Sequence, residues 1–243
     1  MRRAAGRRRG GRMLDATNRV REVTARLEAR YGVAVREGAS DAVEMLVACI
    51  LSQHTSDANS HRAFESLRAR FASWEAVVEA PTPAVAEAIR GAGLANTKAP
   101  RIQEALRMVR EREGRFDLER LAGLPDADAR HYLMSLPGVG PKTAAIVLCF
   151  ALGRPVLPVD THVFRVSWRL GLVDRRRGEG RAHDALGAIV PPELVYRFHM
   201  ALIRHGRQVC RAPEPRCGLC PLTDLCAYYA ACVAPAAPAQ RDD

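Results

Sequence analysis

The stretch LPGVGPKTAAIVL, residues 136–148, decides the architecture expected of this chain. A Pro-Gly-Val-Gly turn precedes a proline, a lysine and an apolar run rich in helix-forming residues. Gly138 and Gly140 permit backbone conformations that are closed to other residues, and they let the backbone approach a ligand closely. Pro141 suits the first position of a helix. The stretch therefore predicts two helices joined by a tight hairpin that includes Val139.

The hairpin by itself leaves two functions open. The free N–H groups and the positive dipole end of the second helix would face it, which makes a cradle for a phosphate group without reading any base. This is the form of a helix-hairpin-helix element that binds DNA. An ordinary corner between two helices, with nothing bound, explains the same residues.

Lys142 lies one residue into the second helix, where cations are disfavoured by the helix dipole. A nucleophilic lysine would gain there, because its neutral amine is the favoured form. Lowering a lysine pKa from ~10.4 to ~7–8 requires about 4 kcal/mol. A helix terminus supplies at most ~2 kcal/mol, so burial or a second cation would have to add the rest. A lysine that pairs with a phosphate is the alternative.

A second candidate for chemistry lies in LPVDTHVFRV, residues 157–166. Asp160 precedes a helical pattern, where a carboxylate is ordinarily an N-cap. The same carboxylate would also suit a site at which positive charge develops on a sugar ring. The flanking Val159 and Val163 are expected to be buried and to hold Asp160 stiffly.

Four cysteines form the most specific pattern of the chain, C-x6-C-x2-C-x5-C. Four thiolates at this close spacing imply a metal centre. Zinc sites usually pair two short C-x2-C knuckles, whereas only one is present here, and the wider arms suit a larger [4Fe–4S] cube. Zinc remains the alternative at this point. The expected ligands are Cys210, Cys217, Cys220 and Cys226.

Helical periodicity recurs along the chain, and no strand pattern stands out. An apolar stripe begins at Leu14 and continues through Val20, Val23 and Leu27, and Thr82-Pro83 suggests an N-cap with proline at the first helical position. The pattern predicts an all-α fold of roughly ten helices. Expected helices include residues 98–112, 126–135, 161–170, 180–190 and 194–207.

Composition limits the class of protein. The 243 residues are 48% hydrophobic, which suffices for a sizeable core, and the formal net charge is +10. Six arginines within residues 1–12 carry more than half of that charge, which predicts a disordered basic arm that binds polyanions. No apolar run approaches the ~20 residues of a transmembrane helix. We expect a cytoplasmic, nucleoid-associated protein.

Taken together, these motifs resemble the endonuclease III family of DNA base-excision glycosylases. The resemblance extends from about residue 42 to residue 229, and its anchors are LVACILSQHTSD, GLANTKA, LPGVGPKTAAIVL, VDTHVFRV, HGRQVC and the four-cysteine loop. It implies two helical lobes with a DNA-binding cleft between them. One lobe is a six-helix barrel of residues 35–153, and the other combines residues 13–34 with 154–232 around a [4Fe–4S] cluster. Residues 233–243 are expected to be a loose tail.

The resemblance also implies a mechanism. A damaged base is flipped out of the duplex. Lys142 attacks C1′ of the deoxyribose and displaces the base, a Schiff base forms, and β-elimination cuts the strand. Asp160 stabilises the developing sugar cation, and Leu94 is the wedge that props the stack open. Strict alignment places His54 at the family's gap-filling glutamine, with Gln53 one residue earlier.

The resemblance implies that a monomer binds double-stranded DNA with damaged bases or abasic sites. Oxidised pyrimidines are the expected substrates. Two other functions stay open. One is a mismatch-type monofunctional glycosylase, although Lys142 and the short C-terminal segment argue against it. The other is a non-catalytic helix-hairpin-helix DNA-binding protein with a structural metal, against which the presence of both Lys142 and Asp160 argues.

Overall fold

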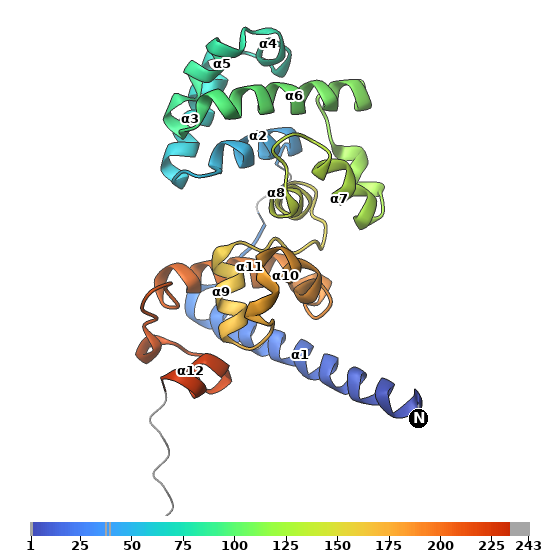
Figure 1. Cartoon of the computed structure of the whole chain (residues 1–243), viewed down its shortest axis with the longest axis vertical. Coiled ribbons are helices and arrows are strands. Elements are labelled where there is room, and N and C mark those ends of the chain that lie inside the picture. Colours follow the sequence, from blue (N-terminus) through green and yellow to red (C-terminus); the bar gives the residue numbers. More distant parts are fainter. Residues whose placement is uncertain (1, 37, 39, 234–243) are drawn as a thin grey trace, which may run out of the picture. The chain divides into compact units, whose positions relative to one another are not determined.

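The computed structural model describes residues 2–36, 38 and 40–233, and this part of the chain is helical without a β-strand. The predicted all-α class is therefore confirmed. No helix in the described ranges is long and apolar enough to cross a membrane. Figure 1 shows the helices α1 (Arg2–Tyr31), α2 (Ala42–Ser52), α3 (Asp57–Arg70), α4 (Trp74–Glu79), α5 (Thr82–Ala88), α6 (Ala95–Glu113), α7 (Asp126–Met134), α8 (Pro141–Ile146), α9 (Thr161–Arg169), α10 (Gly178–Gly187), α11 (Val195–Gln208) and α12 (Ala227–Cys232).

The chain divides into two compact units. Unit 2 is the continuous segment Arg36–Pro158, and unit 1 combines Met1–Val35 with Val159–Asp243. Unit 2 is thus inserted into unit 1 along the sequence, between α1 and α9.

Unit 2 is built around α2, which packs against α3, α6 and α8. Leu46, Ile50 and Leu51 of this helix are fully buried, because its sequence is apolar on every side. Asp41 starts the helix by accepting hydrogen bonds from the backbone N–H groups of Val43 and Glu44 at 2.7 and 3.1 Å. The core of α2 therefore fixes where its C-terminal end lies within the unit.

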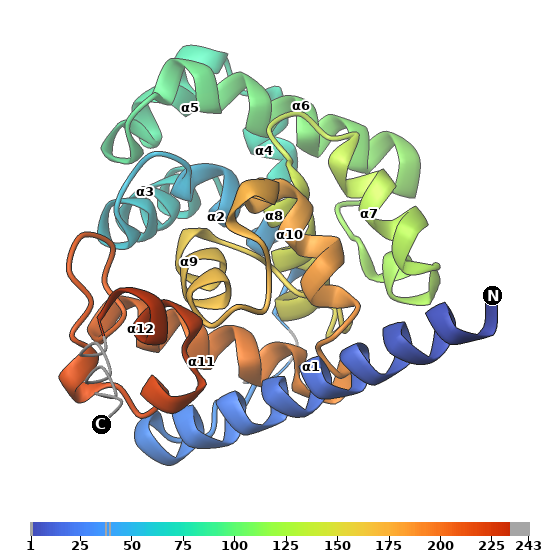
Figure 2. The ribbon, with the colours of Figure 1, turned by 60° about the horizontal axis from the view of Figure 1, so that its bottom comes forward.

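In unit 1, α11 packs against α1 and α9, and α9 also contacts α10 and α12 (Figure 2). The Arg197 guanidinium of α11 donates two hydrogen bonds to the Glu28 carboxylate of α1, at 2.6 and 2.5 Å. Val20, Val23 and Leu27 of α1 are completely buried, as their spacing predicts. Leu14 was expected in the same stripe, but it is 68% exposed because it precedes the region covered by the rest of the unit.

Several boundaries differ from the predicted ones. Residues 2–12 were expected to be disordered, whereas α1 begins at Arg2; alanine and arginine favour helix here, although three glycines in the run oppose it. Most of the expected tail, residues 234–243, lies outside the described part of the chain. Unit 2 extends to Pro158 rather than 153, because Arg154 donates hydrogen bonds to the carbonyls of Leu121 and Leu124.

The start of one helix and the presence of two short helices also differ from the prediction. Thr82 does not cap α5, because Pro81 occupies the N-cap position and the Thr82 hydroxyl lies 2.8 Å from the Gln103 side-chain oxygen. The short helices α4 and α12 were not predicted, since neither is long enough to show a period of 3.6 residues.

Candidate active site and metal centre

The hairpin between α7 and α8 contains a left-handed glycine. Gly138 has φ = +79°, and a Cβ atom added there would lie 3.4 Å from Cδ of Arg101. Gly140 differs from the prediction, because its φ of −98° and ψ of 179° are open to any residue. A Cβ atom added at Gly140 would meet no other part of the protein within 4 Å, so a ligand can approach the backbone closely. Val139 is buried in the core of unit 2, which leaves only its backbone for an outside contact.

Lys142 is the second residue of α8 and its side chain is exposed. None of the ion pairs among the described residues involves it, so its amine is free to meet a substrate. Burial raises the pKa of the Cys49 thiol on α2 to about 12, and the nearby positive charge of Lys142 partly opposes this rise. Lys142 therefore lies near the face of α2 that carries Cys49.

The chain has only two lysines, Lys98 and Lys142, and all the other residues in its Lys+Arg total of 37 are arginines. Arginine would carry the same charge, but it is not deprotonated in proteins. A primary amine at Lys142 can become a nucleophile, which a guanidinium cannot.

A groove of about 420 Å³ lies along α2 and α3 in unit 2, and Cys49 is part of its lining. Its walls are largely apolar, with carboxylates, hydroxyls and an imidazole among them. A flat heterocycle with hydrogen-bonding edges suits such a lining. The lining consists of Ser40, Asp41, Glu44, Met45, Ala48, Cys49, Ser52, Ser60, His61 and Phe64.

Two exposed side chains of unit 2 project from left-handed backbone. His54 has φ = +54° and Leu94 has φ = +50°, and no other non-glycine residue in the described ranges has positive φ. Leu94 is also 58% exposed, which is unusual for a large apolar side chain. Non-glycine residues held in this region cost of order 1–3 kcal/mol and cluster at functional sites. These are the positions that the family resemblance assigns to gap filling and wedging.

Gln53 has a different task from His54. Its side-chain amide donates a 2.7 Å hydrogen bond to the carbonyl oxygen of Gly138, so it links the end of α2 to the hairpin. The sequence pattern named both residues as DNA contacts, but only the His54 side chain is exposed. Gln53 is half-buried and partly engaged within the protein.

Asp160 caps α9 in unit 1. Its carboxylate accepts a 2.7 Å hydrogen bond from the backbone N–H of Val163, and the residue is 8% exposed. Arg165 of the same helix donates to the carbonyl oxygens of Cys210 and Gly206, both at 2.9 Å, and its guanidinium also contacts the His162 ring. The segment that begins with Asp160 is thus joined directly to the first cysteine of the loop.

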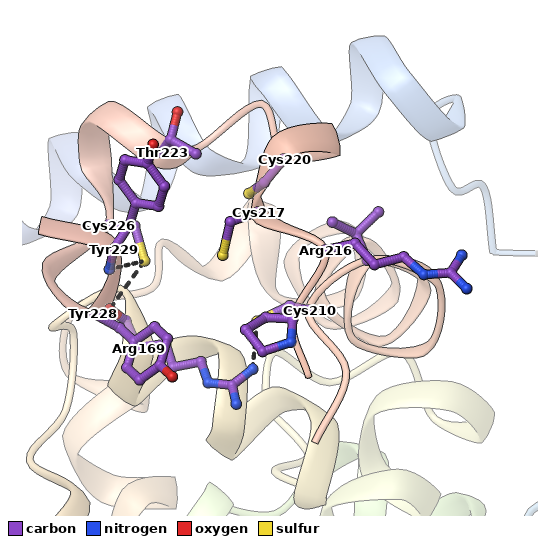
Figure 3. Close-up of a pocket in the computed structure, with 11 residues that line it drawn as sticks. Arg169, Cys210, Arg216, Cys217, Cys220, Thr223, Cys226, Tyr228 and Tyr229 are labelled. Atoms are coloured by element: carbon purple, nitrogen blue, oxygen red, sulfur yellow. Dashed lines mark hydrogen bonds between the residues drawn. The ribbon is translucent and has the colours of Figure 1, made fainter. Parts of the chain in front are cut away.

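The four cysteines that the sequence pattern names line one cavity, shown in Figure 3. This cavity is small, about 20 Å³, and partly open to solvent. No three His, Cys, Asp or Glu side chains in the described ranges meet closely enough to hold a single metal ion. The sulfurs of Cys210, Cys217, Cys220 and Cys226 border this shared space.

Arg169 is a functional residue that the sequence did not reveal. Its guanidinium is buried and donates to the Cys210 sulfur at 3.2 Å and to the Arg211 and Ala212 carbonyls at 2.7 and 3.0 Å. It also stacks 4.9 Å from the centre of the Tyr228 ring. A cation so placed favours negative charge in the cavity. Arg169 lies far from the cysteines in the sequence, so the cysteine pattern does not include it.

Burial raises the pKa of the Cys220 thiol to about 11 and raises the pKa values of Cys217 and Cys226. A bound metal would offset this desolvation and favour the thiolates. His205 beside Cys220 is neutral at physiological pH, because burial lowers its pKa to about 4. Its Nδ1 atom lies 3.1 Å from the Tyr31 hydroxyl of α1.

Residues 47–192 match the model of the HhH-GPD superfamily base excision DNA repair protein. This span covers more than half of the chain and includes the hairpin, Lys142 and Asp160. The chain belongs to the HhH-GPD superfamily. It is a DNA glycosylase of base excision repair.

Members of the superfamily named endonuclease III are similar over most of the chain. The protein from Escherichia coli strain K12 is 36% identical over 190 residues, which cover 78% of this chain and 85% of the relative. That of Thermotoga maritima is 33% identical over 190 residues, covering 78% and 84%. A protein of Arabidopsis thaliana described as a DNA glycosylase is 39% identical over 162 residues, or 67% of this chain, and the chain spans about half of its length, 55%.

Solved structures of superfamily members agree with the fold. A trapped covalent intermediate of endonuclease III with DNA aligns with a TM-score of 0.75 and 30% identity, covering 87% of this chain and 96% of that one. A non-covalent complex of endonuclease III with DNA gives a TM-score of 0.74 and 30% identity, with 87% and 95% covered.

Proposed function

We propose that the protein is a bifunctional DNA glycosylase and AP lyase that removes oxidised pyrimidines from double-stranded DNA as a monomer. The observation that carries this proposal is the exposed, unpaired amine of Lys142 directly after the hairpin. The neutral amine attacks C1′, and the bond between C1′ and the base breaks as the base departs with the electron pair. The nitrogen loses one proton, and the C1′–O4′ bond then breaks as the C1′=N bond of the protonated Schiff base forms, with O4′ taking up a proton. Loss of a C2′ proton to a base then expels the 3′ phosphate.

Asp160 would supply the negative charge that the sugar needs during this reaction. As the glycosidic bond breaks, positive charge develops on the deoxyribose, and a fixed carboxylate stabilises it. The hydrogen bond from the Val163 N–H and the burial of Asp160 keep the carboxylate in one orientation. The attachment of this helix to the cysteine loop through Arg165 adds to that rigidity.

The groove on α2 and α3 is proposed to receive the extruded base. Its lining includes Cys49, which lies near Lys142, so a base held there would place its sugar within reach of the amine. Leu94 would enter the stack, and His54 would occupy the gap left by the departed nucleotide. Extrusion costs a few kcal/mol, and less for a lesion that stacks poorly.

The cysteine cavity is proposed to hold a [4Fe–4S] cluster. Four cysteine sulfurs border a shared space, which suits a cube with one cysteine on each iron. Arg169 and the backbone N–H of Tyr229 direct hydrogen bonds to the sulfurs of Cys210 and Cys226, as expected around thiolates. When bound, the cluster would cross-link the loop. Purified protein should then be yellow-brown and contain about four irons.

Borohydride trapping on a duplex with one abasic site tests the nucleophile. Because the chain contains only two lysines, the adduct can be assigned to a residue by peptide mass spectrometry. We expect the wild type to be trapped at Lys142. Lys142→Ala should lose the adduct and base release by at least ~10³-fold while binding DNA. Lys142→Arg is the matched control that keeps the charge, and it should fail equally.

Two outcomes would contradict this proposal. Normal excision by Lys142→Ala would remove the assigned nucleophile. Base release by the wild type without any adduct would indicate a monofunctional glycosylase, and binding without either activity would indicate a DNA-binding protein.

A further inference from the structure

Lys98 is the larger puzzle of the two lysines, because it is buried. It is 2% exposed and lies in the first turns of α6. Its Nζ atom donates hydrogen bonds to the carbonyl oxygens of Leu51 at 2.7 Å and Ala92 at 2.9 Å. Burial lowers the pKa of this amine, and no ion pair within the described ranges gives it a carboxylate.

Both carbonyls that receive these bonds stand just before the strained turns. Leu51 lies three residues before His54, at the C-terminal end of α2. Ala92 lies two residues before Leu94, in the turn that leads into α6. One buried ammonium group therefore connects the backbone segments that lead into the only two non-glycine residues with positive φ in the described ranges.

Burial of the Lys98 ammonium without a carboxylate is not a favourable way to stabilise a core. Removing a cation from water costs several kcal/mol, and apolar side chains of similar volume often serve a core equally well. Arginine, which supplies all but two of the Lys and Arg residues of the chain, has a bulkier, planar head than the compact ammonium that meets these two carbonyls. Placement of the two turns is the function that remains.

We propose that Lys98 is a positioning residue for base extrusion, which holds the His54 turn and the Leu94 turn at a fixed separation so that both side chains enter the duplex together. This rests on the proposed function. Gln53 extends the same arrangement to the hairpin through the Gly138 carbonyl. The wedge, the gap filler and the phosphate-facing hairpin thus become one rigid set within unit 2.

The proposal predicts a dependence on how strongly the target base is stacked. Lys98→Met keeps the length of the side chain but removes its donors. Misplacing reacting groups by about 1 Å can lower a rate 10²-fold, so we expect single-turnover excision of a well-stacked lesion to fall about 10- to 100-fold. Borohydride trapping at a preformed abasic site needs no base extrusion and should change by less than about 3-fold.

Gln103 provides a matched control on the same helix. It is 1% exposed and its amide also donates to two carbonyls, those of Val77 and Ala80, at 2.9 and 2.8 Å. These carbonyls belong to α4 and its end, and no strained turn follows them. We therefore expect Gln103→Leu to lower stability. Unlike Lys98→Met, it should reduce excision and trapping by the same factor.

A double-mutant cycle and a fluorescent base make the test independent of folding and of the lyase step. Leu94→Ala alone and combined with Lys98→Met should reduce excision by similar factors, because one residue acts through the other. Duplexes with 2-aminopurine beside the lesion should brighten less on binding Lys98→Met than on binding the wild type. This signal does not require chemistry, so it decides the role of Lys98 even if Lys142 proves not to be the nucleophile.

Equal losses on stacked lesions and abasic sites would overturn the proposal, as would additive effects of Lys98→Met and Leu94→Ala. If Lys98→Met does not fold, Lys98→Arg is measured instead. Because the guanidinium is bulkier than the ammonium, we expect this variant also to lose more excision of stacked lesions than trapping at abasic sites. Wild-type behaviour of Lys98→Arg would also contradict the proposal.

Discussion

The strained turns of unit 2 and the cysteine loop of unit 1 solve the same problem in different ways. Both present functional groups from segments without regular structure. In unit 2, Lys98 and Gln53 hold the turns by donating to backbone carbonyls above a continuous apolar core. In the cysteine loop, Leu222 is the one buried apolar side chain between Cys210 and Cys226. The loop must therefore depend on thiols, arginines and the proposed cluster.

Arginines from α1 hold the outer side of this loop. Arg26 contacts both oxygens of the Asp224 carboxylate at 2.7 and 2.9 Å and the Pro221 carbonyl at 3.3 Å, while Arg19 donates to the Leu225 carbonyl. Such exposed contacts contribute little individually. The order of unit 2 thus comes from its apolar core, whereas the order of the loop rests on polar contacts and on the proposed cluster.

Removal of a cluster ligand should separate the two regions most clearly. We expect Cys220→Ser to lose most of its iron and to make the loop sensitive to limited proteolysis, since a structural metal site can contribute ~10 kcal/mol. Unit 2 should keep its protease resistance. Cys232→Ser is the control, because Cys232 is exposed and outside the cavity. Simultaneous loss of protection in both units would contradict the comparison.

A change in the core of unit 2 should have the opposite selectivity. Leu106 is fully buried, and Leu106→Ala should lower the free energy of unfolding by about 2–5 kcal/mol. Urea denaturation followed by circular dichroism measures this loss, and iron content should stay unchanged. Leu219→Ala in the cysteine loop is the control, as Leu219 is 57% exposed. Equal destabilisation by both substitutions would refute the assignment.

Arg169→Gln tests the polar support of the cysteine loop. It removes the hydrogen bond to Cys210 and those to two carbonyls, for an expected loss of about 1–3 kcal/mol. Iron release to a chelator should become faster at unchanged secondary structure. Arg175→Gln offers a comparison, because Arg175 stacks 5.0 Å from the Trp168 ring but does not line the cavity. Wild-type release from Arg169→Gln would exclude a supporting role.

The smallest effect is expected from pH at the surface of unit 2. The Arg120 guanidinium donates two hydrogen bonds to the Glu113 carboxylate, at 2.7 and 2.8 Å. These bonds hold the pKa of Glu113 below the ordinary value of 4.5. A lowered pKa stabilises the fold above pH 4.5, and this contribution disappears as the pH falls through the lowered value. Glu113→Gln should cost about 0.5–1 kcal/mol at pH 7 and less at pH 3. Urea midpoints at both values check this, and a constant difference would contradict it.

Much of the fold followed from local patterns. The apolar sequence of α2, the stripe of α1 and the Asp160 cap are consequences of residues within one or two turns, so periodicity and capping rules predict them. The cysteine spacing also brought four thiols to one cavity. The links that complete the candidate site span long distances in sequence, such as the 85 residues between Gln53 and Gly138. No periodic pattern encodes those contacts.

The left-handed backbone at His54 and Leu94 also could not be predicted from the sequence. Glycine commonly adopts positive φ, whereas histidine and leucine do not, so neither residue type indicates this conformation. Lys98 was expected simply as the start of the helix 98–112, and Arg169 was merely one residue of the helix expected over 161–170. Their roles became visible only when the carbonyls and sulfur that they reach were placed by the packing of other helices.

The insertion of unit 2 within unit 1 has a consequence for biosynthesis. Unit 2 is complete once Pro158 has left the ribosome, but α1 must wait for α11. At about 5–20 residues per second the wait lasts several seconds, during which the apolar face of the first helix has no partner. Nascent chains should therefore recruit chaperones at this stage, and iron loading would be the last step of maturation.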